Sequence, residues 1–275
     1  MRSNDMNQKE QKFARTVWEY YERNGRHSLP WRKTSNPYRI LVSEIMLQQT
    51  QVDRVLPKYR AFLTQFPTVT SLAEATLGEV LRAWQGLGYN RRAKMLHTCA
   101  QSVVREHAGK FPKTYEALVA LPGIGPYTAG AVLAFAFNSA TPIIETNIRS
   151  VMIHHFFHDD TDVPDREIMQ VVARTLEIDR VREWYYALMD YGVYIKKEFG
   201  NPNSKSKHYA KQSTFKGSDR EIRGAVLRTL AKGTNTRAQL LTQLPFEDVR
   251  IDAQVENLLR EGLIEQVQKK YQLPT

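Results

Sequence analysis

Cysteine is nearly missing from this chain: among its 275 residues, only Cys99 carries a thiol. One thiol cannot form an internal disulfide, and it cannot supply the set of thiolates that a structural zinc site or an iron–sulfur cluster requires. We therefore expect a protein with no cysteine-bound metal, and we expect no other cofactor.

Long apolar runs are also missing. No stretch approaches the 18 apolar residues that a membrane span needs, and MRSNDMNQKEQKFARTVWEYYERN at the start lacks the apolar segment of a signal peptide. We therefore expect a cytoplasmic protein that is neither membrane-spanning nor secreted. Hydrophobic residues make up 42% of the chain and charged residues 25%, so the protein can still bury a core.

Alternating strand patterns are missing before residue 262, whereas apolar residues recur at helical spacing almost throughout. The pattern predicts an all-α main body. It favours continuous helices over 39–66 and 71–85, and further helices over 113–120, 126–137, 147–157, 165–178 and 182–195.

Positive charge is in excess. The formal net charge is +10, and residues 196–218 supply +5 of it through six lysines and one glutamate. Such a charge favours a polyanionic partner, although an ordinary cationic protein would also carry it. Residues 201–218 have no apolar period and predict a lysine-rich loop or linker.

Residues 219–275 predict three short helices followed by a hairpin, the pattern of a winged helix. The helix in the recognition position carries Asp252, Glu256 and Glu261, which suit phosphates poorly. We therefore favour a structural or protein-binding role for this module over a second DNA-reading role.

The segment LPGIG, residues 121–125, precedes a helix that begins with Pro126. Two glycines allow close backbone approach, and the free amides of a helix start attract a phosphate. The segment predicts the hairpin of a helix–hairpin–helix motif that grips the DNA backbone, although it could be an ordinary Gly-Pro connector. The expected DNA contacts are Gly123, Ile124, Gly125, Tyr127 and Thr128.

Two acids stand out beside this hairpin. Glu44 lies among apolar residues in YRILVSEIMLQQTQV, where an apolar wall would raise its pKa and make it a proton donor. A solvated helix glutamate is the plain alternative. Glu145 follows Gly125 by twenty positions.

Three motifs in order, LPWRKTSNPYRILVSEIMLQQTQVDRVLPKY, AWQGLGYNRRAKMLH and LPGIGPYTAGAVLAFAF, closely resemble the MutY branch of the helix–hairpin–helix base-excision DNA glycosylases. The resemblance implies a glycosylase domain over residues 1–200 with two helical lobes, one of residues 28–133 and one of 1–27 plus 134–200. It also implies that DNA binds across the cleft and that the target nucleotide is flipped out of the duplex.

The resemblance assigns roles by position. Glu44 stands where the family keeps its proton donor, and Glu145 stands where an aspartate usually stabilises the oxocarbenium sugar. Asn147 matches an asparagine that holds the acid and the sugar. Tyr127 matches a tyrosine that assists at the active site in some MutY-like enzymes. The same position carries lysine in bifunctional glycosylase/lyases, so the resemblance implies a monofunctional enzyme. The residues implied to contact the base or to wedge into the duplex are Arg32, Gln48, Gln49, Thr50, Tyr89 and the adjacent Asn90.

The chain departs from the family in three respects: Glu145 replaces the aspartate, the four cluster cysteines are missing, and a winged helix stands where a Nudix-like domain usually reads 8-oxoguanine. We expect a monomer that binds double-stranded DNA with a mismatch or damaged base, in the nucleoid if the source is prokaryotic. Adenine opposite 8-oxoguanine or guanine is the leading substrate. Alternatives are thymine, uracil or another damaged base, or a catalytically silent DNA-binding protein whose winged helix recruits a protein partner.

The segment HHFFHDD contains His154, His155 and His158 and could suggest a metal site. Two of these histidines are four residues apart on the expected helix, but no third ligand is evident. We therefore interpret them as packed or surface histidines.

Overall fold

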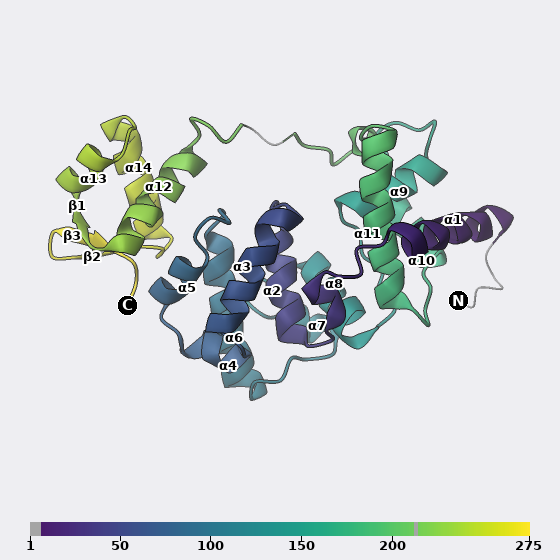
Figure 1. Cartoon of the computed structure of the whole chain (residues 1–275), viewed down its shortest axis with the longest axis horizontal. Coiled ribbons are helices and arrows are strands. Elements are labelled where there is room, and N and C mark those ends of the chain that lie inside the picture. The colour runs from purple at the N-terminus through teal and green to yellow at the C-terminus, as the bar shows by residue number, and fades with distance from the viewer. Residues whose placement is uncertain (1–6, 212–213) are drawn as a thin grey trace. The chain divides into compact units, whose positions relative to one another are not determined.

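The structure, a computed structural model, describes residues 7–211 and 214–275. The parts of the expected N-terminal lobe and of the lysine-rich loop that fall on residues 1–6 and 212–213 lie outside the described residues. The described chain is helical apart from one small sheet, which confirms the expected all-α class (Figure 1). None of its helices is long and apolar enough to cross a membrane.

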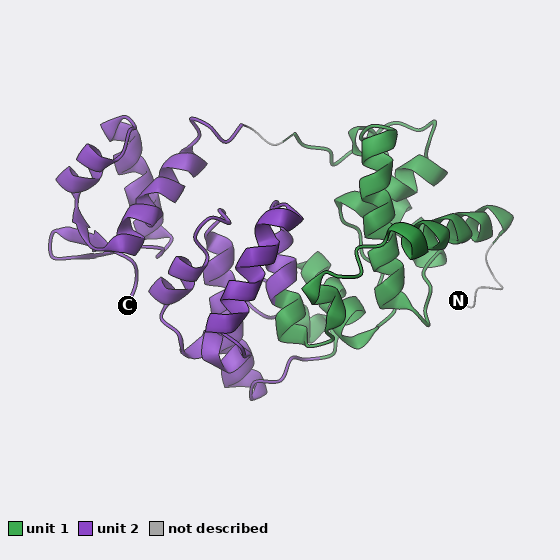
Figure 2. Ribbon diagram, viewed as in Figure 1, with its two compact units in different colours: residues 1–41, 113–119, 124–211 green, residues 42–112, 120–123, 212–275 purple. Residues whose placement is uncertain are grey.

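The chain forms two compact units (Figure 2). Unit 1 contains residues 1–41, 113–119 and 124–211, and unit 2 contains residues 42–112, 120–123 and 212–275. Three stretches that we expected in the other lobe therefore cluster with unit 1: residues 28–41, 113–119 and 124–133.

Contacts with one helix explain this difference. The Tyr186 hydroxyl donates to the Trp31 carbonyl at 3.4 Å, and the Tyr186 ring stacks on Phe135 at 4.9 Å. These contacts draw the segment around Trp31 and the helix that contains Phe135 toward the helix of Tyr186.

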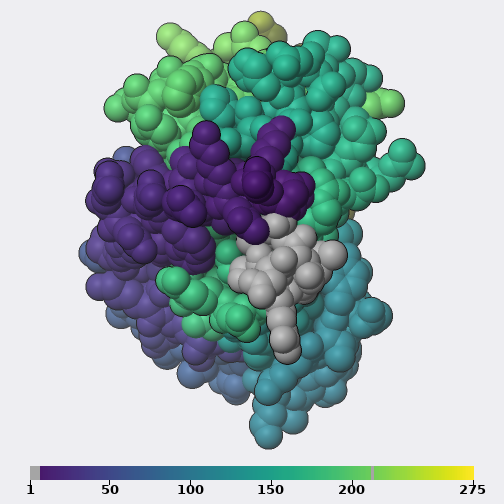
Figure 3. Space-filling model, turned by 90° about the vertical axis from the view of Figure 1, so that its right-hand side faces the viewer, coloured from purple at the N-terminus to yellow at the C-terminus, as the bar shows by residue number. Residues whose placement is uncertain are grey.

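Unit 1 is built around two helices, α9 and α11, which pack along each other. Its N-terminal helix α1 packs on α11 and forms part of the surface seen in Figure 3. The elements of unit 1 are α1 (Gln8–Asn24), η2 (Pro30–Lys33), α7 (Tyr115–Val119), α8 (Pro126–Phe137), α9 (Thr146–Phe156), α10 (Asp165–Arg174), α11 (Val181–Glu198) and η3 (Pro202–Lys205).

Helix α2 (Pro37–Leu47) begins in unit 1 and ends in unit 2. The bundle of unit 2 continues with α3 (Val52–Gln65), α4 (Val69–Glu74), α5 (Leu77–Ala83) and α6 (Arg91–His107). Two of the expected continuous helices are broken. The break between α2 and α3 contains Gln49, whose φ is +54°, and the break between α4 and α5 is made by a capping box in which Thr76 accepts from the Glu79 amide.

The rest of unit 2 is the predicted winged helix. Its helices are α12 (Asp219–Lys232), α13 (Arg237–Gln243) and α14 (Asp248–Arg260), and its strands are β1 (Asn235–Thr236), β2 (Glu265–Val267) and β3 (Lys270–Gln272). The strands form an antiparallel sheet in the order β1-β3-β2. The short β1 was not expected, because two residues are too few to show an alternating pattern.

Candidate active site

Glu145 lies at the N-terminus of α9 in unit 1. Its backbone is extended, and its carboxylate accepts from the backbone amides of Asn147 at 2.7 Å and Ile148 at 2.9 Å. The Asn147 side chain donates to the second carboxylate oxygen at 3.0 Å. The acid is therefore an N-cap held in one orientation by three donors, which satisfies amides that α9 itself leaves unpaired.

The Glu145 carboxyl is partly accessible at the surface but largely surrounded by protein. Burial raises its pKa, and the two amide hydrogen bonds together with the charges of Lys196 and Arg149 offset only part of that effect. The carboxylate anion is thus less well solvated here than in water, so a positive charge placed beside it would be stabilised strongly.

The segment that leads to Glu145 is fixed from two sides. Gly130 in α8 allows close approach, because a Cβ there would lie 2.4 Å from the Ile143 side chain. Tyr185 of α11, fully buried, accepts from the Ile143 amide at 3.1 Å and donates to the Thr141 carbonyl at 2.9 Å. Tyr185 therefore belongs to the core and also positions the segment that leads to the acid.

Asn147 is held by a second glycine. A Cβ on Gly192 of α11 would lie 2.4 Å from the Asn147 carbonyl oxygen, so only glycine lets α11 pack this close to the start of α9. The Asn147 side-chain oxygen is buried and has no hydrogen-bond partner in the described structure. An acceptor in this position can receive a hydrogen bond from a bound molecule.

Arg32 lies in a buried ion pair. Its guanidinium donates to both oxygens of Asp190, at 2.6 and 2.8 Å, and stacks on the Tyr186 ring at 4.6 Å. Arg26 donates to the same carboxylate from its amide and its side chain. Burial acts to raise the pKa of Asp190, but the two arginines outweigh it and hold the pKa below its usual range. This arrangement favours a positioning role for Arg32, and its expected DNA contact stays a prediction.

The two hairpin glycines differ. Gly123 has a φ of +75°, and a Cβ there would lie 2.6 Å from the Met95 side chain, so the fold of unit 2 requires it. Gly125 has an ordinary φ and open space beside its Cα. The fold does not require glycine at 125, which agrees with the close approach of a molecule from outside.

The hairpin leads into α8 as expected. Pro126 occupies the first turn, where its missing N–H costs no hydrogen bond. Ile124 and Thr128 are buried and Tyr127 is partly exposed. Tyr127 is therefore more accessible to a bound molecule than Ile124 or Thr128.

Glu44 is buried in α2, with 8% of its surface exposed, between the buried Ser43 and Ile45. A buried glutamate is uncommon, so Glu44 is not the solvated helix glutamate of the plain alternative. Its role as a proton donor stays a prediction.

The turn after α2 is organised by Arg92, a residue that we did not single out from the sequence. The Arg92 guanidinium donates to the carbonyls of Ile45 at 2.7 Å, Met46 at 3.0 Å and Gly88 at 3.1 Å, and to the Thr50 hydroxyl at 3.2 Å. Burial lowers the pKa of Arg92 to about 10, which leaves it charged at neutral pH. One side chain thus ties the end of α2 to the loop before α6.

The expected base contacts of unit 2 lie around this arginine. Thr50 is buried, Gln48 is partly exposed, and Gln49 and Tyr89 are exposed. Tyr89 has a φ of +47°, and its ring centre lies 5.5 Å from the Arg92 guanidinium carbon. Tyr89 is 36% exposed, so part of its side chain is accessible to a bound molecule, as a wedge would require. Asn90 directly precedes α6 and its side chain makes no capping bond.

The segment after α11 does not fit an iron–sulfur cluster, because it contains no cysteine and Cys99 is buried in α6. Instead, Asn203 of η3 donates to the Thr146 carbonyl at 3.1 Å and the Ser150 hydroxyl at 2.7 Å. An amide side chain therefore fastens this segment to the helix that begins at Glu145.

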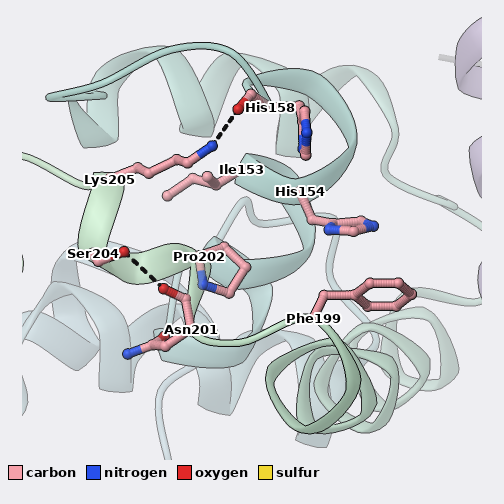
Figure 4. A pocket seen from close by; sticks show the side chains of 8 residues that line it. All are labelled: Ile153, His154, His158, Phe199, Asn201, Pro202, Ser204 and Lys205. Atoms are coloured by element: carbon pink, nitrogen blue, oxygen red, sulfur yellow. Dashed lines mark hydrogen bonds between the residues drawn. The ribbon is translucent and has the colours of Figure 1, made fainter.

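A cavity of about 370 Å³ lies beside this segment (Figure 4). His154, His158 and Phe199 line it, and the Lys205 amine donates to the His158 carbonyl. His155 is packed elsewhere and shares a hydrogen bond of 3.1 Å with the Tyr191 hydroxyl. Among residues 7–211 and 214–275, no three His, Cys, Asp or Glu side chains are grouped so that they could hold a metal ion.

Comparison with known proteins places the chain. Residues 42–176 match the HhH-GPD superfamily of base excision DNA repair proteins. An adenine DNA glycosylase of Mycolicibacterium smegmatis is 36% identical over 265 residues, covering 88% of this chain and 89% of that protein. One from Mycobacterium tuberculosis is 35% identical over 279 residues (93% and 91%), and the human one is 40% identical over 149 residues (51% and 27%).

Solved structures agree. A thermostable thymine-DNA glycosylase has a TM-score of 0.60 and 25% identity, covering 68% of this chain and 87% of that chain. An endonuclease III–DNA covalent intermediate shares the fold with a TM-score of 0.53 and 19% identity, covering 69% and 86%. The chain therefore belongs to the HhH-GPD superfamily of base excision DNA repair proteins. Within it, the chain belongs to the adenine DNA glycosylase family, and it is a DNA-binding glycosylase that hydrolyses N-glycosyl bonds.

Proposed function

We propose that this enzyme removes adenine mispaired with 8-oxoguanine or guanine, acting as a monomer on duplex DNA. Two relatives that match about nine-tenths of their own length are named adenine DNA glycosylases, and SEIMLQQTQ follows the adenine branch of the family. Because the alignments span nearly all of this chain and of both relatives, they support the same activity, adenine excision, for the whole chain.

The observation that carries the proposal is the bonding of Glu145. As the glycosidic bond breaks, positive charge develops on the sugar, and a fixed carboxylate stabilises that charge. Glu145 is fixed by three donors, and its raised pKa indicates an anion that lacks full solvation. The positive charge that develops on the sugar stabilises this poorly solvated carboxylate. Their electrostatic attraction is therefore strongest in the transition state.

Glu44 serves as the proton donor in this scheme. It protonates the departing purine and afterwards helps to activate the water that attacks the sugar. Its burial in α2, with 8% of its surface exposed, supports this role.

The reaction ends with base release. Tyr127 stands where bifunctional members of the superfamily carry lysine, and a phenol cannot form the Schiff base on which strand cleavage depends. We propose a monofunctional glycosylase. We also propose that it works without an iron–sulfur cluster, because its sequence lacks the four thiolates.

A panel of duplexes tests the substrate. Each duplex carries adenine, thymine, uracil or an alkylated purine opposite guanine, 8-oxoguanine or cytosine, and single-turnover excision is read as strand breaks after alkali. We expect fastest excision of adenine opposite 8-oxoguanine, with breaks only after alkali. Thymine is included because the chain resembles a thymine-DNA glycosylase in structure. Faster excision of thymine opposite guanine would refute adenine as the substrate and indicate thymine mismatch repair instead.

A further inference from the structure

The winged helix is seated on the bundle of unit 2 by close backbone contacts. The Gly78 amide of α5 donates to the Pro274 carbonyl at 2.9 Å, and a Cβ at Gly78 would lie 2.4 Å from that oxygen. Lys94 of α6 donates to the Glu261 carbonyl at 2.5 Å, beside Gly262, whose φ is +61°. Two glycines thus permit an approach that other residues would obstruct.

One arginine of the winged helix reaches the exposed tyrosine of the bundle. Arg220, at the start of α12, donates to the Tyr89 hydroxyl at 2.7 Å, and its guanidinium carbon lies 5.7 Å from the Tyr89 ring centre. Arg92 lies 5.5 Å from the same ring centre. The ring therefore has two guanidinium neighbours, one from the bundle and one from the winged helix.

Arg220 is itself held in place. Its guanidinium also donates to the Thr214 carbonyl at 3.1 Å. Arg250 of α14 donates to the Gly217 carbonyl at 2.9 Å and to the Asp219 carboxylate at 2.7 Å, which fixes the start of α12. The contact with Tyr89 is therefore made by an anchored side chain.

Helix α14, which stands in the recognition position of the winged helix, is poorly suited to DNA. Asp252 of α14 forms an ion pair with Arg237 of α13 at 2.5 Å, so one of the few cations near the recognition helix is already neutralised. The contacts described above directly support a role in which the winged helix binds the bundle of unit 2. They do not support a role in which α14 reads DNA.

We propose that the winged helix holds the Tyr89 wedge through Arg220, which makes Arg220 a positioning residue for base flipping. The proposal rests on the proposed function and on the wedge role that the family resemblance implies for Tyr89. The Tyr89 side chain is 36% exposed, and the hydrogen bond from Arg220 to its hydroxyl holds the ring in one orientation before DNA binds.

A double-mutant cycle in the full-length protein tests this. The variants are Arg220→Ala, Tyr89→Phe and the double variant, and Arg228→Ala, exposed on the same helix, is the matched loss of one positive charge. Flipping is measured by fluorescence of 2-aminopurine in the duplex, and excision by single-turnover rates. We expect Arg220→Ala to slow both by about five- to tenfold, Arg220→Lys to recover part of the loss, and Arg228→Ala to change little.

The cycle separates positioning from a direct phosphate contact. If Arg220 acts through the Tyr89 hydroxyl, Arg220→Ala should have little further effect once Tyr89→Phe has removed that hydroxyl. Fully additive effects on flipping, with binding weakened in a salt-dependent way, would overturn the proposal in favour of a phosphate contact.

The 2-aminopurine measurement does not require any base to be excised. Absence of adenine excision by the parent enzyme would therefore refute the proposed substrate, while coupling between Arg220 and Tyr89 in the 2-aminopurine measurement would still support the positioning role of Arg220. Absence of that coupling would refute the positioning role of Arg220 and leave the proposed substrate untouched.

Discussion

Asn147 donates to both oxygens of the Glu145 carboxylate, from its backbone amide at 2.7 Å and from its side chain at 3.0 Å. The acid and its partner are thereby locked into one unit, whose remaining polar atom, the Asn147 side-chain oxygen, is buried without a partner. A carboxylate oriented this tightly before substrate binds requires little reorganisation during the reaction.

The first prediction follows from that orientation. Glu145→Gln keeps the shape but removes the anion, so excision should fall by a factor on the order of 100 or more, while DNA affinity changes only a few-fold. Single-turnover rates and binding isotherms on the same duplex measure the two effects. Glu145→Asp tests the length of the side chain, because it should lose activity if the three donors are placed for glutamate. Parent-like excision by Glu145→Gln would make the residue structural.

The second prediction concerns Glu44. Glu44→Gln removes the proposed proton donor and base, so base release should drop by about 100-fold or more, with binding to lesion DNA largely retained. The substitution is nearly isosteric, and circular dichroism with thermal unfolding serves as the folding control. Excision at the parent rate would refute the assignment.

The third prediction concerns pH and stability. The folded-state pKa of Glu145 is raised above 4.5, its ordinary value, so the folded state binds this proton more tightly than the unfolded state does. The contribution of the group to stability is therefore full below pH 4.5 and is lost as pH rises through the raised pKa.

Glu145→Gln should consequently be at least as stable as the parent at pH 7, with the difference shrinking toward pH 4.5. Urea unfolding at several pH values measures this. A variant that is clearly less stable at pH 7 and matches the parent only in acid would contradict the raised pKa.

The fourth prediction concerns Gly192. Gly192→Ala places a Cβ against the Asn147 carbonyl, which should destabilise the fold by about 1–3 kcal/mol and displace the acid enough to slow excision. Gly224→Ala is the control, because its nearest neighbour is the flexible end of Arg228 at 3.3 Å. That helix position should tolerate alanine or gain stability from it. Equal unfolding free energies and equal excision rates for the two variants would show that the close packing of Gly192 on Asn147 affects neither stability nor activity.

The fifth prediction concerns the cofactor. Purified enzyme should contain neither iron nor acid-labile sulfide, and EDTA should leave excision unchanged, because the chain has one thiol. Metal analysis and visible absorbance provide the measurement. Stoichiometric iron and sulfide would refute the proposal.

The sequence predicts the helical class, the winged helix and the hairpin, because each has a local signal in helical spacing or in glycine and proline. It also locates Glu44 and Glu145 through resemblance. Contacts between distant segments leave no such signal. Tyr185 looks like any buried aromatic residue until its hydroxyl is seen to bridge the Ile143 amide and the Thr141 carbonyl.

Arginine illustrates the same limit. Arg32 and Arg92 both lie inside the motifs that resemble the family, but the sequence assigned a role only to Arg32. The structure shows Arg32 paired with a buried Asp190 and Arg92 bound to backbone carbonyls at the end of α2. The partner of each arginine depends on tertiary packing. Arg32 and Asp190 are 158 positions apart in the sequence, and Arg92 and Ile45 are 47 positions apart.

The buried thiol of Cys99 has a chemical consequence for an enzyme of DNA repair. Burial raises its pKa to about 12, so almost none of it is thiolate at neutral pH, and its side chain is closed to solvent. Peroxide reacts with accessible thiolates. The protein therefore offers peroxide no reactive cysteine in the part of the chain that the structure describes, and a thiol-specific reagent should leave the folded enzyme unmodified.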